Sequence, residues 1–146
     1  MATLGVRPIT VDNLPPAVAL RPADEEECRA GGLSPLEALT TSIQLSHQAY
    51  EVVADDGWII GWWGHAPVAV LGNIGVAWAL TGPGADHHPF LLGRMSYNMS
   101  AHLMLRYAEV FCQVDLHHRV ARNWLSRLGF DEINRSGRFA TMRKVR

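Results

Sequence analysis

The stretch from Glu109 to Phe130, EVFCQVDLHHRVARNWLSRLGF, constrains the fold of this chain more than any other segment. Its first part alternates in the manner of a buried strand, and Asp115 then stands where a helix N-cap is expected. Apolar residues on one helical face follow at Leu116, Val120, Ala121, Trp124, Leu125 and Leu128. Gly129 suits the left-handed residue just past a helix end, and Phe130 can fold back onto the last turn. The stretch therefore predicts a strand, a helix and a defined helix stop.

A second strand is predicted ahead of this unit. Residues Ile74 to Leu80, IGVAWAL, form an apolar run typical of a central strand. A turn-rich loop, Thr81 to Pro89, separates this run from a long predicted helix, Phe90 to Tyr107. Because a helical crossover of this kind joins parallel strands, the strands at about 74–80 and 108–114 are expected to lie side by side and parallel.

The remaining predicted elements are shorter. Gly5 to Ile9 is expected to be an edge strand, and two helices should follow, one that begins near Asp24 and ends at Gly31-Gly32, and one capped by Ser34 with Glu37. Turns are expected at Asp55-Asp56-Gly57 and Gly64-His65-Ala66. The strands predicted there and in a C-terminal hairpin are Tyr50–Val53, Trp58–Trp63, Pro67–Leu71, Asp131–Ile133 and Phe139–Val145. This order predicts one α+β domain over residues 1–146, with a mostly antiparallel sheet.

The composition is that of a folded domain. Hydrophobic residues make up 48% and charged residues 18% of the 146 residues. No apolar run approaches the roughly 20 residues that span a bilayer, and the N-terminus has no signal-peptide pattern, so a cytosolic protein without membrane contact is expected. Cys28 and Cys112 show neither metal-binding nor redox spacing, so both are expected to be reduced and no metal site is predicted.

Charge is distributed unevenly along the chain. Residues 1–60 hold three arginines against nine acids, whereas residues 117–146 hold eight basic residues against two acids. A basic end beside an acidic one allows contact with nucleic acid or self-association, and the simpler reading is two solvated faces. The basic residues concerned are Arg119, Arg122, Arg127, Arg135, Arg138, Arg143, Lys144 and Arg146.

The order of elements resembles the GCN5-related N-acetyltransferase (GNAT) superfamily over nearly the whole chain. The most specific segment is His118 to Phe130, HRVARNWLSRLGF, in which Ala121, Leu128, Gly129 and Phe130 fit the family pattern. The resemblance implies a GNAT-like mixed sheet with one parallel strand pair joined by a crossover helix, and helices on both faces.

A narrower resemblance is to small GNAT-like proteins of short-tailed bacteriophages, which act in virion assembly as internal virion proteins. It is carried by TGPGADHHPF, by VDLHHRVARNWLSRLGF and by the tail GRFATMRK. It implies protein-protein contacts with other virion or assembly proteins, self-association, and a location in the host cytoplasm during assembly or in the virion.

The departures from the GNAT pattern weaken the expectation of catalysis. Family enzymes bind the pyrophosphate of acetyl-CoA on backbone N–H groups in a glycine-rich loop. Here that loop is Thr81 to Pro89, with unusual spacing and an acidic Asp86. The helix position where the family often carries a tyrosine acid is Leu125, and IGVAWAL holds no glutamate base. The first hypothesis is therefore a catalytically degenerate protein with no cofactor. The alternative is an active N-acetyltransferase that binds acetyl-CoA through Leu80, Gly82, Gly84, His88 and Leu91.

The histidines are the remaining candidates for chemistry. His87, His88 and His118 are expected to converge near the mouth between the parallel strands, where His88 or His118 would be the substitute base. The adjacent pairs do not have the spacing of a metal chelate. An exposed Trp62 or Trp63 would indicate a protein partner.

Overall fold

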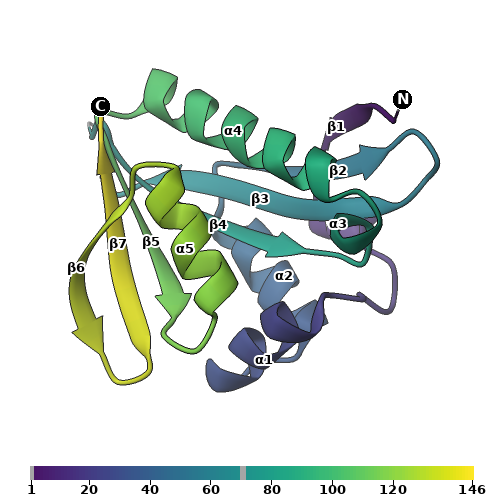
Figure 1. Ribbon diagram of the computed structural model, residues 1–146, viewed down its shortest axis with the longest axis horizontal. Coiled ribbons are helices and arrows are strands. Elements are labelled where there is room, and N and C mark those ends of the chain that lie inside the picture. Colours follow the sequence, from purple (N-terminus) through teal and green to yellow (C-terminus); the bar gives the residue numbers. More distant parts are fainter. Residues whose placement is uncertain (1, 70–71) are drawn as a thin grey trace.

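A computed structural model describes residues 2–69 and 72–146 (Figure 1). The strands are β1 (Leu4–Pro8), β2 (Gln48–Ala54), β3 (Ile59–Pro67), β4 (Ile74–Thr81), β5 (Glu109–Asp115), β6 (Asp131–Ser136) and β7 (Phe139–Val145). The helices are the 3-10 turn η1 (Val11–Asn13), α1 (Pro22–Ala30), α2 (Pro35–Leu45), α3 (Gly84–His87), α4 (Pro89–Arg106) and α5 (Arg119–Arg127). The strands form one sheet in the order β1-β2-β3-β4-β5-β7-β6, which confirms the predicted α+β class.

Strands β4 and β5 are parallel neighbours at the centre of the sheet, as predicted. Their pairing is short, because only Ile74 to Val76 of β4 lies in register with Glu109 to Phe111 of β5. Beyond these residues the two strands diverge, and each keeps its antiparallel partner on the outer side, β3 for β4 and β7 for β5. The sheet is therefore split along the C-terminal halves of its two central strands.

Helices cover both faces of the sheet, and each face has its own core. Helices α4 and α5 pack on one face through Met95, Leu103 and Leu125, together with sheet residues such as Val110. On the other face, α1 and α2 pack through Cys28, Leu39 and Ile43 against Trp62 and Leu80. In the view of Figure 1, α4 lies above β3, α5 stands between β5 and β4, and α1 and α2 lie below β4. The predicted arrangement of helices on both faces is confirmed.

The observed N-cap agrees with the predicted one at α2 but not at α5. Ser34 and Glu37 form the predicted capping box of α2. At α5 the N-cap is His118, whose ring nitrogen accepts a hydrogen bond from the backbone N–H of Ala121, so the prediction of Asp115 as cap is wrong. Asp115 is instead the last residue of β5, and its carboxylate accepts hydrogen bonds from Arg138.

The predicted stop of α5 is confirmed. Gly129 has a φ of 94°, a left-handed conformation that glycine adopts without steric cost. The backbone N–H of Phe130 donates to the carbonyl oxygen of Leu125 at 3.0 Å, and the Phe130 side chain is buried. The chain therefore folds back onto the last helical turn and enters the C-terminal hairpin.

The turn predicted at Gly64-His65-Ala66 is wrong, because β3 runs through it without interruption. A side chain at Gly64 would meet the Trp78 ring at 2.6 Å, and the neighbouring His65 is fully buried. The glycine thus makes room for a tryptophan on the next strand rather than for a turn. The predicted strand Pro67–Leu71 is also wrong as far as Ala69, because β3 ends at Pro67. Residues 70 and 71 lie outside the described residues.

Candidate functional site

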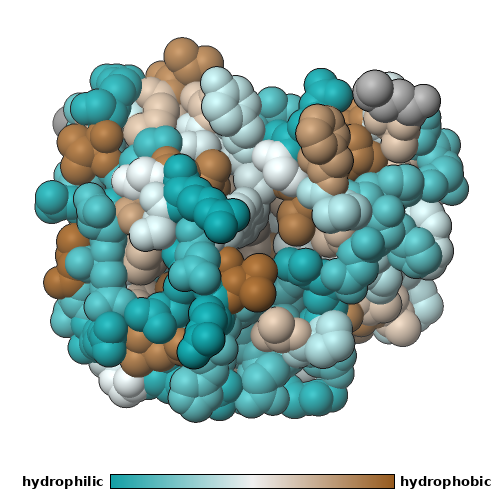
Figure 2. Space-filling model, viewed as in Figure 1, coloured by the Kyte–Doolittle hydropathy of each residue, from teal (hydrophilic) through white to brown (hydrophobic). Residues whose placement is uncertain are grey.

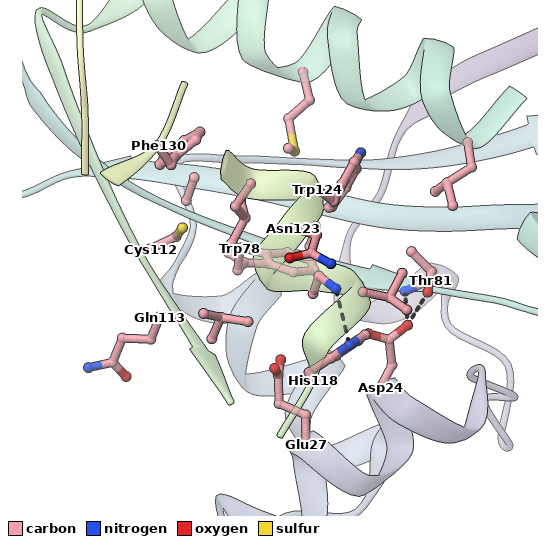
Figure 3. A pocket seen from close by; sticks show the side chains of 18 of the residues that line it. Asp24, Glu27, Trp78, Thr81, Cys112, Gln113, His118, Asn123, Trp124 and Phe130 are labelled. Atoms are coloured by element: carbon pink, nitrogen blue, oxygen red, sulfur yellow. Dashed lines mark hydrogen bonds and ion pairs between the residues drawn. The ribbon is translucent and has the colours of Figure 1, made fainter. Parts of the chain in front are cut away.

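A cavity of about 360 Å³ opens where β4 and β5 diverge. Its walls are the facing edges of the two strands together with apolar side chains of α4 and α5, among them Leu92, Met99 and Trp124. Figure 3 shows Trp78, Cys112 and Phe130 around this space, with Trp124 on its α5 side. In Figure 2, which looks onto the same face as Figure 1, deeper atoms are visible near the centre between the side chains of the overlying helices.

Backbone groups of both strands point into the split. The bonds from Val68 N–H to the Ile74 oxygen and from Gly82 N–H to the Ile60 oxygen place the even-numbered residues of β4 in hydrogen bonds with β3. Because hydrogen-bonding direction alternates along a strand, the N–H and C=O groups of Ala77 and Ala79 face β5 instead. The Ala77 N–H takes part in the last pairing with β5, at Phe111, and beyond it no strand in the described part of the chain pairs with this edge of β4.

The same alternation applies to β5. The bond from Leu116 N–H to the Arg138 oxygen places the even-numbered residues of β5 against β7. The backbone groups of Gln113 therefore face β4 across the split. The cavity is thus bordered by peptide groups of both strands that are directed at whatever occupies it.

Helix α1 closes the open end of the split. The Asp24 carboxylate accepts bonds from the backbone N–H of Thr81 (3.1 Å), from the Thr81 hydroxyl, and from the His118 ring (3.1 Å). Three residues further on, Glu27 accepts the backbone N–H of Asp115 at 2.8 Å. Figure 3 shows both side chains rising from α1 toward the cavity. One turn of α1 therefore connects the last residue of β4 with the last residue of β5.

Two arginines bind the strand-end residues that this contact connects, Thr81 and Asp115. Arg21 Nε donates to the Thr81 hydroxyl at 2.8 Å, and its guanidinium lies 3.5 Å from Asp86. Arg138 donates to both carboxylate oxygens of Asp115, at 2.9 and 2.8 Å. Burial of Asp115 opposes its ionisation, but the Arg138 guanidinium outweighs that effect and holds the pKa of Asp115 below its usual value. The mouth of the cavity is thus a connected network of charged and polar groups.

Two groups in the network have raised pKa values. Burial alone lowers the pKa of His118, but the hydrogen bond and charge of Asp24, together with Glu27, outweigh burial and raise it. For Glu27 burial itself raises the pKa, and the bond from the Asp115 backbone only partly offsets it. On the α4 side of the sheet, burial lowers the pKa of His65 to about 4, and its ring bonds to the Tyr107 hydroxyl at 2.8 Å.

The raised pKa values of His118 and Glu27 predict that stability falls as pH rises. A folded-state pKa above the unfolded value stabilises the protein at low pH, and this contribution to the free energy of unfolding is lost as pH rises, from about 6.5 upward for His118 and from about 4.5 upward for Glu27. Buried neutral His65 acts in the opposite sense, with stability lost as pH falls from 6.5 toward about 4. Each group contributes at most about 1.4 kcal/mol per pH unit.

The measurement is urea unfolding at several pH values. Replacing His118 with asparagine should flatten the alkaline side of the profile and leave the acid side in place, because His65 is unchanged. An alkaline slope of the same size in His118→Asn would show that other groups cause it.

The predicted convergence of three histidines does not occur. His118 lines the cavity, whereas His87 stacks on Trp58 with ring centroids 3.8 Å apart, and His88 bonds to Asp56 at 2.7 Å. The contacts of His87 and His88 are with the turn between β2 and β3, so these two histidines do not line this cavity. A catalytic role for His88 or His118 stays a prediction.

The predicted CoA-binding residues lie beside the cavity rather than in its wall. A Cβ on Gly82 or Gly84 would meet the Ile59 backbone oxygen at 2.9 or 2.3 Å, so these glycines allow the loop to pack against β3. Part of the loop forms helix α3, and the backbone N–H groups of Gly82, Ala85, Asp86, His87 and His88 are all used in hydrogen bonds to backbone carbonyls. Leu80 and Leu91 are core residues, one on each face of the sheet. Ala77, Ala79 and Thr81 line the wall instead.

Leu125, which stands where the family often carries a tyrosine acid, belongs to the cavity lining. Leu125 is buried, and no tyrosine occurs among the described lining residues. Cys112 also lines the cavity, but burial raises the pKa of its thiol to about 12, which keeps it protonated and unreactive at neutral pH. Asp24, Glu27 and Arg21 are not among the residues predicted for the site, because an acidic helix start is normally interpreted as a solvated helix end.

Three further observations concern partner binding, metal ions and membranes. Trp62 and Trp63 are both buried, so neither is an exposed partner-binding residue. The described residues contain no group of three or more histidine, cysteine or acidic side chains placed to hold a metal ion. In residues 2–69 and 72–146, no helix is long and apolar enough to span a membrane.

The basic C-terminal residues are mostly engaged within the protein. Arg122 and Arg135 pair with Glu132, Arg138 with Asp115 and Glu26, and Arg143 with Glu109. These pairs reduce the charge available to phosphate groups. Nucleic-acid binding through this region stays a prediction.

Solved structures resemble this fold over nearly its whole length. AAC(6')-Ib in complex with paromomycin and acetyl-CoA matches with a TM-score of 0.67 at 14% identity, covering 99% of this chain and 94% of the other. The chain has a GNAT fold. A chimera of spermidine N-acetyltransferase SpeG from Vibrio cholerae and hSSAT matches at TM-score 0.62 and 14% identity, covering 97% and 95%. A protein from Desulfovibrio desulfuricans assigned to the GNAT family matches at 0.63 and 14%, covering 98% and 99%.

Sequence comparisons add no closer relative. No protein-family model matches the chain, and no curated protein matches it. The identities to the solved structures are too low to transfer an activity, so the GNAT fold is what these structures establish. None of these findings supports the narrower resemblance to phage virion proteins.

Proposed function

We propose that this protein is an acetyl-CoA-dependent N-acetyltransferase that holds its cosubstrate mainly through the split between β4 and β5. The observation that carries the proposal is the open cavity bordered by backbone groups of Ala77, Ala79 and Gln113. A degenerate protein under no need to bind a ligand is expected to fill such a split with side chains, since unpaired peptide groups in an apolar cavity are costly.

The chemistry of the cavity suits the pantetheine arm of CoA. This arm is narrow and carries two amide groups, so it can pair with the edges of β4 and β5 as an added strand would. The apolar walls from α4 and α5 fit its methylene and methyl groups. Bound acetyl-CoA would supply the acetyl group as a thioester, and the protein's part is to bind and orient it.

The phosphates would require positive potential near the cavity. Helix α4 begins at Pro89, close to the end of β4, and a helix N-terminus favours anions. Two arginines line the cavity, Arg21 and Arg127, and Arg21 is already engaged with Thr81 and Asp86. Because the loop N–H groups are used internally, we expect weaker phosphate binding than a free glycine-rich loop provides.

His118 is suited to hold the mouth of the cavity rather than to act as a base on a substrate. Its Nδ1 accepts from the Ala121 backbone at 3.3 Å, so Nε2 carries the proton and donates to Asp24. Both ring nitrogens are therefore engaged. With His118 engaged in this way, catalysis would rest mainly on positioning the amine beside the thioester, which contributes more than acid-base catalysis in many enzymes.

Titration calorimetry with acetyl-CoA tests this proposal. We expect a dissociation constant in the micromolar range, and a rise in the free energy of unfolding of about 2.7 kcal/mol when the ligand is at one hundred times that constant. Free adenosine diphosphate serves as the control and should bind much more weakly, since it lacks the pantetheine arm. No heat at hundred-micromolar acetyl-CoA, together with unchanged unfolding, would reject the proposal. Assembly contacts with virion proteins would then be the remaining hypothesis.

A further inference from the structure

A second cavity, of about 500 Å³, lies on the α2 side of the sheet. It shares four lining residues with the first cavity, namely Ala77, Trp78, Cys112 and Gln113. All four belong to β4 or β5 at the split. The two cavities therefore approach each other through the divided sheet, one from the α4 and α5 side and one from the α2 side.

The lining of the second cavity carries no charge among the residues that the structure describes. Leu45, Val76 and Phe111 supply apolar surface, and Leu45 and Val76 are exposed to solvent at the rim. Ser42 and Thr141 supply hydroxyl groups. The Ser46 hydroxyl is already engaged, because it donates to the Ser42 carbonyl (2.6 Å) and accepts from Trp78 Nε1 (2.7 Å).

An uncharged lining discriminates between classes of amine. An alkylammonium ion that enters it would lose its hydration without gaining a carboxylate partner. A neutral amine carries no charge and does not incur this desolvation cost. At the split, neither His118 nor Cys112 is free to remove a proton, since both His118 nitrogens are engaged and the Cys112 thiol has a pKa of about 12. The carboxylates of Asp24 and Glu27 line the first cavity and not the second, so an acceptor in the second cavity is expected to arrive with its nitrogen lone pair free.

We infer that the second cavity is the acceptor site and that it takes apolar, weakly basic amines of the aromatic amine class. This inference rests on the proposed acetyltransferase function. Aromatic amines are unprotonated at neutral pH because the ring withdraws the lone pair, and their rings suit the apolar surface of Phe111, Trp78 and Leu45. The nitrogen lone pair forms the new N–C bond, the C–S bond of the thioester breaks, and the proton lost by nitrogen ends on the departing thiolate.

The test measures binding of two amines to the full chain without acetyl-CoA, 4-methylaniline and 1,5-diaminopentane. Saturable shifts of the Trp78 indole N–H resonance report occupancy of the cavity, with the resonance assigned from Trp78→Phe. We expect 4-methylaniline to bind at least about tenfold more tightly than the diamine. Ser42→Asp adds a carboxylate to the lining and should move that ratio at least about tenfold toward the diamine. Thr41→Asp places the same charge on an exposed neighbour outside the lining and should leave the ratio unchanged.

The outcomes separate this inference from the proposed function. Tighter binding of the diamine to the wild-type protein, or no shift of the Trp78 resonance with either amine, overturns the inference. Acetyl-CoA binding accompanied by acetylation of the diamine in preference to 4-methylaniline also overturns it while leaving the proposed function intact. Failure of acetyl-CoA to bind rejects the proposed function, whereas the amine preference is still measured directly by the indole shifts.

Discussion

Replacing Ala79 with phenylalanine is expected to abolish acetyl-CoA binding while the protein stays folded. Ala79 is half-buried on β4, its side chain packs at the α4 and α5 core, and it lines the cavity at the split. A phenyl ring there would occupy part of the 360 Å³ that the pantetheine arm needs. The ring enters existing space, so burial of its apolar surface offsets strain and stability should change by less than about 1 kcal/mol.

The measurement is calorimetric titration of Ala79→Phe beside the wild-type protein, with an expected loss of affinity of at least about 100-fold. Ala101→Phe is the matched control, since Ala101 lies exposed on α4 and away from the cavity lining. Unchanged affinity in Ala79→Phe would show that acetyl-CoA binds elsewhere, and equal losses in both variants would point to a general effect of the added ring.

Replacing Asp24 with asparagine is expected to lower the free energy of unfolding by about 3 to 5 kcal/mol, the usual cost of removing one partner from a buried charged network. The carboxylate serves three donors, on Thr81 and His118. An asparagine has one carbonyl oxygen, so its NH₂ group must face a donor on one side. The asparagine NH₂ group and the donor that it faces would then meet with no acceptor between them. Residue 24 is only 5% exposed, so water cannot replace the lost hydrogen bond.

Urea unfolding of Asp24→Asn and of Glu25→Gln provides the comparison. Glu25 is adjacent on α1 and, among the described residues, forms an ion pair only with the exposed Arg29, so its replacement should cost no more than about 0.5 kcal/mol. Asp24→Asn and His118→Asn should also be strongly non-additive when combined, because they break one network. Additive losses, or equal costs for the two acids, would contradict the role given to Asp24.

Local patterns were sufficient for several elements of the fold. The capping box of α2 and the glycine stop of α5 depend on residues within one helical turn, and both are as predicted. The parallel pairing of β4 and β5 followed from the crossover helix between them. The prediction failed at Gly64, where a glycine was taken for a turn although it accommodates the ring of Trp78 on the neighbouring strand. Pairing partners of that kind cannot be recognised from one strand alone.

The candidate site was less predictable than the fold. Of the residues proposed for catalysis or CoA binding, only His118 lines the cavity, while Gly82, Gly84 and His88 support the adjacent loop. The cavity wall is formed by small apolar residues such as Ala77 and Ala79, whose side chains carry no chemical signal. What these residues contribute is the direction of their backbone groups, which depends on the strand register and on the divergence of two strands.

By itself, the sequence determined the main helices, the cap of α2, the stop of α5, the central apolar strand and the crossover that makes the fold GNAT-like, because each depends on periodicity or contacts between near neighbours. Only the tertiary structure decided that the central sheet is split, that the split is open, and that α1 closes its end. The contacts of Asp24 and Glu27 that do this join residues 57, 94 and 88 positions apart in the chain. Contacts over such distances exist only once the sheet has brought the ends of β4 and β5 together beside α1.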